Sequence, residues 1–226
     1  MPVAVIIPTL NAAPLLPATL AALDGFGLGG FGSVVVADGG SADGTRDLAR
    51  AAGALVVKAP RGRGPQLAAG AAATDAPWLL FLHADTRLGI GGRGTVERFV
   101  VEPGNANRAG YFRLRFASEH PAARRVERLT AWRARRLGLP YGDQGLLIAR
   151  SLYEALGGYR PLPLMEDVDF VRRIGRDRLV ELPAEAVTAA TRYERDGWWA
   201  RPTRNLACLS LYFAGVPPRL IKRMYG

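Results

Sequence analysis

Four short apolar runs, separated by three helical segments, organise the first part of the chain. The runs are rich in Val, Ile and Leu, which is typical of strands buried on both faces, and they occupy residues 3–7, 33–37, 55–57 and 79–82. The segments that we expect to be helical are 15–23, 45–52 and 67–74, and a glycine-rich connection covers 25–32. Strands that alternate with helices predict an α/β fold on a mostly parallel sheet with helices on both faces.

The second part of the chain has fewer strand-like runs. We expect a strand at 109–116, which alternates polar and apolar residues, and helices at 94–101, 122–137 and 168–174. With 226 residues, the chain is long enough for one large domain with a full core. The sequence therefore predicts a single α/β domain whose last 31 residues, 196–226, form a tail.

The charge of the chain is its least ordinary bulk property. It contains 30 Lys and Arg against 20 Asp and Glu, a formal net charge of +10 at pH 7. Such an excess favours anionic partners, which include nucleotide phosphates, nucleic acid and anionic lipid. Cys208 is the single cysteine, so the sequence offers no internal disulfide and fits a reducing compartment. No run of 18 apolar residues occurs and the chain enters a strand at Val3, so we expect a cytoplasmic protein.

Polar residues follow three of the predicted strands at the point where each strand ends. Pro8 to Asn11 follow the first strand, and we expect Pro8 to end it and Asn11 to cap the next helix. Asp38 closes the second strand, where a doubly wound sheet holds its ligand. His83 and Asp85 follow the fourth strand; as alternate residues they point the same way and could hold a divalent cation. A polar cap and a turn remain the alternative for this pair.

Two common nucleotide-binding motifs are absent. A dehydrogenase would carry Gly-x-Gly-x-x-Gly directly after the first strand, where this chain has Pro8-Thr9-Leu10-Asn11. The P-loop pattern that ends in Gly-Lys-Ser or Gly-Lys-Thr does not occur either. These absences argue against nicotinamide chemistry and against P-loop chemistry.

The ordered motifs resemble those of family-2 glycosyltransferases with the GT-A fold. The resemblance covers about residues 3 to 195 and rests on an ordered series of segments: Ile7-Pro8-Thr9-Leu10-Asn11, Val36-Ala37-Asp38-Gly39-Gly40-Ser41-Ala42-Asp43-Gly44-Thr45, Leu82-His83-Ala84-Asp85, Gly142-Asp143-Gln144-Gly145, Gly157-Gly158-Tyr159 and Met165-Glu166-Asp167-Val168-Asp169. The third and fourth segments are most similar to those of small bacterial transferases associated with arsenosugar and selenium-related pathways. The resemblance implies a hexosyltransferase-type enzyme.

The resemblance also implies roles on the donor side. Asp38 matches an acid that hydrogen-bonds the nucleobase, commonly uracil, although it could instead cap a helix. Arg63 could contact a phosphate or remain a solvated loop residue. Asp85 matches the last acid of the family's Asp-x-Asp motif, which holds the metal that bridges the diphosphate. The remaining positions implied to line the nucleotide-sugar are Pro8, Thr9, Asn11, Gly40, His83 and Ala84.

One position departs from the family pattern. His83 stands where the family usually has Asp, and histidine ligates Mn²⁺ more readily than Mg²⁺ or hydrogen-bonds the sugar or phosphate instead. The resemblance thus implies a Mn²⁺ or Mg²⁺ site at His83 and Asp85 that has one carboxylate fewer than usual.

The acceptor side carries the expected catalytic base. Displacement at an anomeric carbon needs a base to take the acceptor's proton, and the resemblance puts Asp167 in that role with Glu166 as its rival. The resemblance favours inversion without excluding retention. Asp169 is expected to be structural, and the acceptor or sugar pocket is expected to include Gly142, Asp143, Gln144 and Gly158.

The helix at 122–137 and the tail contain many arginines. The helix is expected to bury Val126, Leu129 and Trp132 and to expose its arginines, as a solvated face or as a contact with an acceptor or membrane surface. The tail has no acidic residue after Asp196 and either packs back on the domain, contacts another subunit or lies in a membrane interface. By analogy alone, Trp198 and the segment 192–195 could close over the diphosphate.

The sequence therefore predicts a GT-A glycosyltransferase that moves a sugar from a nucleoside diphosphate to a small-molecule or lipid-linked acceptor, and the resemblance implies UDP as the nucleotide. Residues 1–90 would form its nucleotide-sugar half, 91–195 its acceptor half and 196–226 a basic amphipathic tail at the inner membrane face. A sugar-phosphate nucleotidyltransferase is an alternative, but its Gly-Gly-x-Gly-x-Arg loop is missing. A basic nucleic-acid-binding module is another, and it would not require the ordered acidic motifs.

Overall fold

A computed structural model describes residues 2–23 and 32–225. Four parallel strands form the amino-terminal half of its sheet: β1 (Val3–Thr9), β2 (Val34–Asp38), β3 (Leu55–Lys58) and β4 (Trp78–Phe81). β1 and β4 are buried along their whole length because helices cover both faces of this part of the sheet. The predicted strand positions and their parallel pairing are confirmed. The glycine-rich connection at 25–32 lies mostly outside the described residues.

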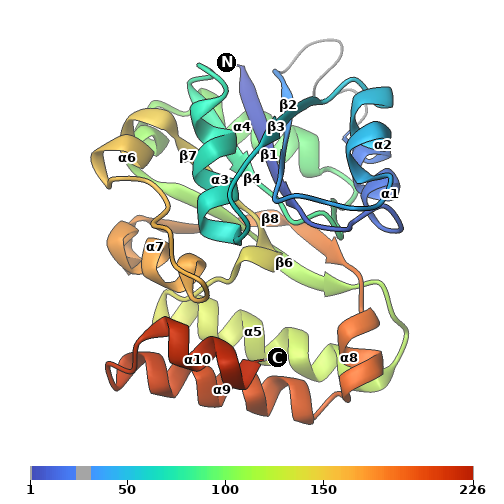
Figure 1. The fold of residues 1–226 in the computed structure, drawn as a ribbon. Coiled ribbons are helices and arrows are strands. Elements are labelled where there is room, and N and C mark those ends of the chain that lie inside the picture. Colours follow the sequence, from blue (N-terminus) through green and yellow to red (C-terminus); the bar gives the residue numbers. More distant parts are fainter. Residues whose placement is uncertain (1, 24–31, 226) are drawn as a thin grey trace.

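Four further strands of mixed direction extend this sheet at the β4 edge. They are β5 (Thr86–Leu88), β6 (Ala109–Phe116), β7 (Leu146–Ala149) and β8 (Leu179–Thr188), and the strand order is β3-β2-β1-β4-β7-β6-β8-β5. β7 runs antiparallel to both β4 and β6, whereas β6 and β8 are parallel to each other. The mixed sheet therefore joins the parallel half to a second half that crosses it (Figure 1).

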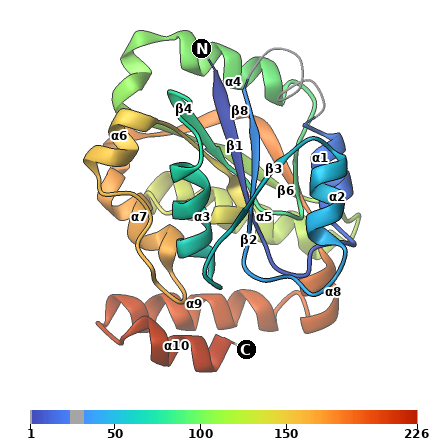
Figure 2. The same ribbon diagram turned by 45° about the horizontal axis from the view of Figure 1, so that its top comes forward.

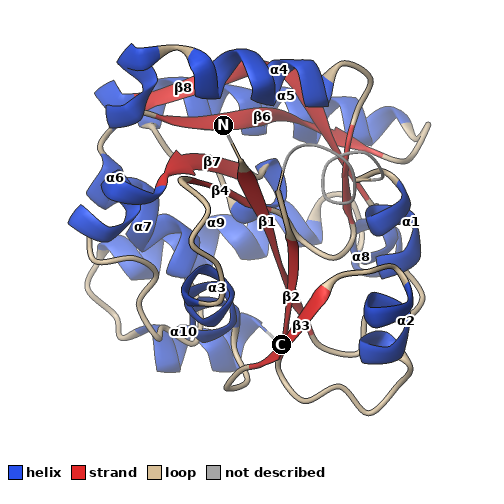
Figure 3. Cartoon of the chain, turned by 90° about the horizontal axis from the view of Figure 1, so that it is seen from above, coloured by secondary structure: helices blue, strands red, loops and turns tan. Residues whose placement is uncertain are grey.

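Helices flank the sheet on both faces, as expected from the alternating pattern. The helices are α1 (Leu16–Ala21), α2 (Thr45–Ala51), α3 (Arg63–Ala72), α4 (Gly92–Val101), α5 (Pro121–Leu137), α6 (Arg150–Ala155), α7 (Glu166–Ile174), α8 (Thr191–Asp196), α9 (Ala200–Phe213) and α10 (Pro218–Tyr225). Seen from above, α1 and α2 lie on one side of the parallel strands and α3, α6 and α7 on the other (Figure 3).

Two local expectations at the end of the first strand are wrong. β1 does not end at Pro8 but continues to Thr9, whose carbonyl accepts the N–H of Gly39 at 2.9 Å. Asn11 does not cap α1, which begins five residues later at Leu16. Its backbone has a positive φ of 50°, and its side-chain oxygen accepts the N–H of Ala42 at 2.9 Å. The residue fastens two loops together instead of starting a helix.

The tail packs back on the domain through its own apolar cluster. Cys208 and Leu209 of α9 and Ile221 of α10 are buried together with residues of α7 and of the preceding loops, chiefly Leu139, Leu164, Met165, Val168 and Val171. In Figure 2, α9 and α10 lie next to each other below the sheet and the other helices. Of the arrangements that the sequence predicts for the tail, the structure shows the tail packed back on the domain.

The predicted buried face of α5 is partly wrong. Val126 is buried against β6, but Leu129 and Trp132 are each 57% exposed. Leu129 and Trp132 follow Arg125 at helical spacings of four and seven, so all three lie on one outward stripe. No described helix is long and apolar enough to cross a membrane.

Candidate active site

The loops after β1 and β2 meet at the carboxyl edge of the parallel strands. Thr9 and Asp38 are directly paired in the parallel register, so both strands end at the same level. The Asn11 N–H donates to the Ser41 hydroxyl at 2.9 Å, and the Ala12 N–H donates to the Thr45 hydroxyl at 2.8 Å. The polar residues of the two motifs thus bind each other and set the shape of this edge.

Asp38 is occupied by its own loop. Its side chain is buried, one oxygen accepts the N–H groups of Gly40 and Ser41, and the other accepts the hydroxyls of Thr9 and Ser41. Burial alone would raise the pKa of Asp38, but these hydrogen bonds, led by that of Ser41, lower it. The alternative considered from the sequence, a helix cap, is wrong, because the N-cap of α2 is Gly44; the Asp38 carboxylate instead holds the turn that follows β2.

Gln66 is a structural residue that the sequence analysis missed. Its side-chain amide is buried and donates to the carbonyls of Thr9 and Ala37, at 2.6 and 2.9 Å, so it closes the ends of β1 and β2 from α3. Its oxygen accepts the Gly62 N–H at 3.3 Å. A glutamine inside an alanine-rich helix gives no sequence signal of this kind, since only the tertiary fold brings it to two strand ends.

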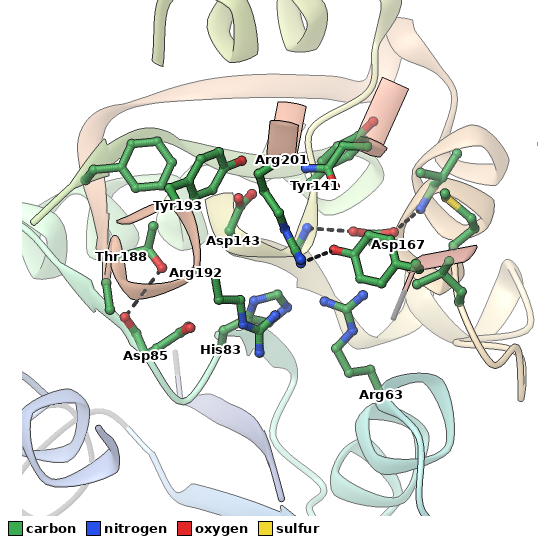
Figure 4. A pocket seen from close by; sticks show the side chains of 18 residues that line it. Arg63, His83, Asp85, Tyr141, Asp143, Asp167, Thr188, Arg192, Tyr193 and Arg201 are labelled. Carbon is green, nitrogen blue, oxygen red and sulfur yellow. Dashed lines mark hydrogen bonds between the residues drawn. The ribbon is translucent and has the colours of Figure 1, made fainter. Parts of the chain in front are cut away.

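A cavity of about 100 Å³ lies beside this edge, between the two halves of the chain. Figure 4 shows Arg63, His83 and Arg192 approaching its centre from α3, from the loop after β4 and from α8. The lining residues are Arg63, His83, Asp85, Phe116, Tyr141, Gly142, Asp143, Leu164, Met165, Asp167, Val168, Thr188, Ala189, Arg192, Tyr193, Arg201, Asn205 and Tyr225. Segments from 63 to 225 thus converge on one small space.

His83 and Asp85 both line this cavity, as their alternate spacing predicts. Burial lowers the pKa of His83 to about 4, and the nearby Arg63 guanidinium lowers it too, so the imidazole is neutral at pH 7. Gly142 lies against the imidazole: a Cβ at position 142 would be 2.5 Å from the Nε2 of His83. Glycine at 142 is therefore required by the close approach of the histidine ring.

Asp167 and Glu166 occupy different environments although they are adjacent. Asp167 lines the cavity, and its two oxygens accept the N–H groups of Gly142 and Val168 at 3.0 and 2.8 Å. Glu166 is buried and pairs with Arg63 at 2.6 Å. Burial raises the pKa of Glu166, while the Arg63 guanidinium opposes this change. Of the two rivals for the base, Asp167 is the carboxylate that lines the cavity.

Backbone geometry places this acid pair. Met165, directly before α7, has a positive φ of 64°, which is uncommon for a residue with a side chain. Asp169, expected to be structural, pairs with Arg160 at 3.1 Å and with Arg173 at 2.7 Å. Arg173 also donates to the carbonyl of Gly158 at 2.8 Å. Asp169 and Gly158 therefore hold the loop before α7 and do not line the cavity.

Asp143 is the most perturbed carboxyl group on the cavity wall. Burial raises its pKa to about 6, against the opposing effect of Arg133. One of its oxygens is buried without a hydrogen-bond partner among the described residues, as is the Asn205 side-chain oxygen on the same cavity. Its neighbour Gln144 points away and donates to the Phe112 carbonyl at 3.1 Å. A ligand with O–H or N–H groups could satisfy both oxygens.

The last helices supply a wall that the sequence did not predict in detail. Tyr193, Arg201, Asn205 and Tyr225 line the cavity from α8, α9 and α10. Arg201 is buried between Asp196, at 3.1 Å, and the Tyr225 hydroxyl, at 2.7 Å. The segment 192–195 reaches the cavity through Arg192 and Tyr193, whereas Trp198 packs on Phe116 and stacks on His120 away from it.

The predicted site residues therefore fall into two groups. Six of them line the cavity: Arg63, His83, Asp85, Gly142, Asp143 and Asp167. The others lie in the surrounding shell of strand ends and loops: Pro8, Thr9, Asn11, Asp38, Gly40, Ala84, Gln144, Gly158 and Glu166. Gly40 has a φ of 94° and open space on its side-chain position, and the Ala84 carbonyl accepts the Thr19 hydroxyl at 2.8 Å.

The donor atoms fit a metal ion that is completed by a bound phosphate. No group of three or more His, Cys, Asp or Glu side chains within residues 2–23 and 32–225 is arranged to hold a metal ion by itself. His83 and Asp85 offer one nitrogen and one carboxylate on the same cavity. Magnesium commonly binds through one or two protein carboxylates and the phosphates of its substrate, so two side chains are a usual protein share.

Comparison with known proteins agrees with this geometry. Residues 4–89 match Glycosyl transferase family 2. The match covers the parallel half of the sheet and includes Asp38, His83 and Asp85, but less than half of the chain. The comparison with curated proteins gave no match.

Solved structures share the fold over most of the chain. A mannosyltransferase from Pyrobaculum calidifontis, in complex with GDP-mannose and Mn²⁺, is 20% identical with a TM-score of 0.68; the match covers 91% of this chain and 60% of that one. Glucosyl-3-phosphoglycerate synthase from Mycobacterium tuberculosis, in complex with Mn²⁺, UDP and glucosyl-3-phosphoglycerate, is 21% identical with a TM-score of 0.57; 83% of this chain and 70% of that chain are covered. The predicted GT-A fold is confirmed, and these comparisons support a glycosyltransferase.

Proposed function

We propose that this protein transfers a sugar from a nucleoside-diphosphate sugar, with UDP as the expected nucleotide, to an acceptor hydroxyl. The observation that carries the proposal is the cavity, which brings His83, Asp85, Arg63 and Asp167 together at the carboxyl edge of a GT-A sheet. The match of residues 4–89 to Glycosyl transferase family 2 supports the same activity. In this proposal residues 1–90 bind the donor and 91–195 the acceptor.

On the donor side, we assign His83 and Asp85 to a divalent cation, Mn²⁺ or Mg²⁺. The structural neighbours named above contain Mn²⁺, and a related structure of the Mycobacterium tuberculosis synthase contains Mg²⁺ and UDP. When bound, the cation neutralises charge on the departing diphosphate. The neutral imidazole of His83 leaves a nitrogen lone pair for such a ligand. Arg63 is assigned to a phosphate oxygen, because its guanidinium lines the same cavity.

On the acceptor side, we assign the base to Asp167. Its carboxylate lines the cavity and is fixed by the N–H groups of Gly142 and Val168, so its oxygens keep lone pairs for the acceptor hydroxyl. The buried Glu166 forms an ion pair with Arg63 and thereby holds this arginine beside the cavity. Direct displacement with Asp167 as base predicts an inverted anomeric product. We propose that the loop network of Thr9, Asn11, Asp38 and Gly40 shapes the nucleoside pocket.

The deciding experiment is a thermal-shift screen of the intact protein with UDP, GDP, UDP-sugars and GDP-mannose, each with and without Mn²⁺ or Mg²⁺. A ligand that binds the native state alone raises its apparent stability with the logarithm of concentration over Kd. We expect a shift with a uridine nucleotide and metal. A flat response to every nucleotide would contradict the proposal.

Asp85→Asn tests the cation site. Replacing the carboxylate by an amide removes one negative charge from the assigned ligand set, so the metal-dependent part of the nucleotide shift should disappear while metal-free unfolding is preserved. Asp75→Asn, a carboxylate outside the cavity, is the matched control and should behave like the unchanged protein. A full metal-dependent shift in Asp85→Asn would remove Asp85 from the cation site.

Asp167→Asn tests the base. The amide keeps the shape of the side chain but cannot take a proton, so kcat should fall by about 10²–10⁴ while donor binding is retained. Donor hydrolysis gives an assay that needs no acceptor, and the donor-induced thermal shift reports binding. Asp177→Asn, outside the cavity, is the control. Wild-type turnover by Asp167→Asn would show that Asp167 is not the base and would leave Glu166 as the candidate.

Three finer assignments remain predictions. The sequence motifs that contain His83 and Gly142 favour the arsenosugar and selenium-associated subgroup of the family. The cytoplasmic location and a small-molecule or lipid-linked acceptor are carried over from the sequence. No feature of the cavity favours a nucleotidyltransferase over a glycosyltransferase, and the Gly-Gly-x-Gly-x-Arg loop of the former is absent.

A further inference from the structure

The positive charge of the chain is concentrated on α5 and on the segment after Asp196. Together these hold eleven Lys and Arg side chains and one acidic residue, Glu127, an excess that equals the +10 of the whole chain. α5, α9 and α10 form the lower layer of the molecule in Figure 1, and Arg125 of α5 lies over the ring of Trp199, which precedes α9, at 3.8 Å. We call this layer the basic helical face.

Large apolar side chains are exposed on the same layer. Thirteen such side chains are exposed within residues 2–23 and 32–225, and eight of them belong to α5, Trp199, α9 or α10, which make up about a fifth of the chain. They are between 45% and 67% exposed: Leu129, Trp132, Leu137, Trp199, Leu206, Phe213, Leu220 and Met224. Exposed apolar groups concentrated in this way mark a surface that contacts another phase or molecule.

Helical spacing arranges these side chains in stripes next to cations. On α9, Leu206 and Phe213 are seven residues apart and share one side of the helix. On α10, Leu220 and Met224 are four residues apart, and Ile221 between them is fully buried, which orients the helix. The outward stripe of α5 carries both kinds of side chain, in the order Arg125, Arg128, Leu129, Trp132 and Arg136.

Most of the cations on this face are available to an external anion. Within the described part of the chain, no ion pair joins a carboxylate to Arg125, Arg128, Arg136, Arg219, Lys222 or Arg223. Elsewhere on the same helices, arginines are neutralised: Arg124 pairs with Glu127 and Arg135 with Glu181. The unneutralised cations are therefore the ones next to the apolar stripes.

We propose that the basic helical face docks the protein on an anionic lipid bilayer. Cations bind the lipid headgroups, while the Leu, Phe and Met side chains enter the boundary of the acyl chains and the two Trp rings lie at the headgroup level. A second copy of the chain would bring two faces of the same charge together. Nucleic acid is bound by cations and stacking aromatics, so it would leave the exposed aliphatic side chains Leu206, Leu220 and Met224 without a partner.

The proposal does not depend on the transferase activity, but it bears on access to the cavity. Arg201, Asn205 and Tyr225 line the cavity from the inner sides of α9 and α10. A helix with its side chains is about 10–12 Å across. A bilayer on the outer side would therefore lie about one helix diameter from the cavity wall.

Vesicle co-sedimentation of the full chain tests the docking. We expect binding to phosphatidylcholine vesicles that contain phosphatidylglycerol and little binding to pure phosphatidylcholine. Binding should be lost as NaCl is raised from about 0.1 to about 0.5 M, because the Debye length then falls below about 10 Å and the charges are screened. The triple variant Arg219→Glu, Lys222→Glu and Arg223→Glu should weaken partitioning by about a hundredfold or more, since each basic residue near such a surface contributes about fivefold.

Matched variants distinguish vesicle binding through the basic helical face from binding that depends only on the total charge or total hydrophobicity of the chain. Lys58→Glu, Arg87→Glu and Arg108→Glu change the net charge equally on exposed positions elsewhere and should weaken binding far less. Leu220→Ser with Met224→Ser should lower binding at high salt, whereas Ile90→Ser with Val101→Ser, exposed outside the face, should not. Unchanged unfolding temperatures establish that each variant is folded.

Three results would overturn the proposal. Equal binding to neutral and anionic vesicles would remove the role of the cations. Equal losses in the two charge-reversed triples would show that only net charge matters. Failure to bind vesicles, together with a dimer in sedimentation velocity or tight binding of a short oligonucleotide, would assign the face to a second copy or to nucleic acid.

Discussion

Asp143 is a carboxyl group on the cavity wall whose ionisation its surroundings oppose. Its carboxyl group lies in the cavity wall near Asp167 and Asp85, and one of its oxygens has no hydrogen-bond partner in the described structure. The pKa of about 6, against an ordinary value of 3.8, follows first from burial. A raised carboxyl pKa means that the unfolded chain loses this proton at lower pH than the folded protein does, so ionisation of Asp143 opposes folding.

Asp143→Asn should therefore stabilise the protein. Because the folded pKa is raised, the gain should be absent below about pH 4, grow as the pH rises to about 6 and then level off, at no more than about 3 kcal/mol. Urea unfolding at pH 4, 5, 6 and 8 measures the difference. Asp75→Asn, outside the cavity, should show no such pH-dependent gain. A constant difference across this range would mean that Asp143 titrates normally.

At the scale of elements, an ion pair joins α3 to α7, which belong to the parts of the chain that we propose to bind the donor and the acceptor. Arg63 lies in the first turn of α3 and Glu166 in the first turn of α7, and their side chains are 2.6 Å apart. Glu166 is 2% exposed, whereas Arg63 is 34% exposed. Gly64 of α3 lies close to α7 and to the loop before it: a Cβ at position 64 would lie 2.3 Å from the Arg160 carbonyl oxygen of that loop and 3.4 Å from the Cβ of Glu166. Glycine at 64 thus permits the contact that the ion pair spans.

A double-mutant cycle on this pair should reveal strong coupling. Arg63→Met leaves a buried carboxylate without its partner and should cost about 3–5 kcal/mol of unfolding free energy. Glu166→Gln leaves an arginine that water can reach and should cost less, about 1–2 kcal/mol. The double variant should be more stable than the sum predicts, with a coupling energy of about 0.5–3 kcal/mol.

The exposed pair of Asp47 and Arg50 on α2 is a suitable reference for this cycle. Their side chains are 85% and 59% exposed, so Asp47→Asn and Arg50→Met should couple by less than about 1 kcal/mol. Urea denaturation at pH 7 gives all seven free energies, because the two cycles share the wild-type protein. An equal coupling energy in the two cycles would show that the Arg63–Glu166 pair stabilises the protein no more than an exposed ion pair does.

At the scale of the whole molecule, Glu181 connects three distant parts of the chain. This β8 residue accepts hydrogen bonds from Arg113 of β6, at 3.0 Å, and from Arg135 of α5, at 2.6 and 2.7 Å. Burial would raise the pKa of Glu181, but the hydrogen bonds and charge of Arg135, followed by those of Arg113, lower it below its ordinary value of 4.5. Its carboxylate thus fastens the basic helix α5 to the sheet.

The stabilisation from Glu181 should be lost in acid. A lowered folded pKa contributes stability above the unfolded pKa of 4.5, and this contribution disappears as the pH falls through the folded pKa. Glu181→Gln should cost about 1 kcal/mol at pH 7 and almost nothing at pH 3, because both arginines are about half exposed. Thermal unfolding at the two pH values measures it. Glu185→Gln, a neighbouring acid on β8 without an ion pair in the described structure, is the control.

Much of the parallel half could be predicted from the sequence because its signals are local. Apolar runs bounded by turn residues placed β1 to β4, and polar residues at their carboxyl ends placed His83 and Asp85 on one cavity. The pairing of the mixed half could not be derived in the same way. The short strand β5 and its partner β8 are about a hundred residues apart, and nothing in either sequence specifies the pairing.

Residues whose role depends on distant partners were the ones missed. Gln66 is visible only as a polar residue in an alanine-rich helix, yet it joins the ends of β1 and β2. Asn205 and Tyr225 reach the cavity because the tail folds back across α7. Leu129 and Trp132 were assigned to a buried face because an amphipathic pattern does not say which stripe meets the sheet.

The position of Arg63 makes the two halves of the chain thermodynamically interdependent. An anion bound in the cavity competes with Glu166 for one guanidinium, because Arg63 faces both. Such coupling is reciprocal. If a bound anion shifts the position of α7 by a given factor, then a ligand that shifts α7 changes the affinity for the anion by the same factor. In the proposed transferase, one arginine side chain can thus couple the binding of the donor to the binding of the acceptor.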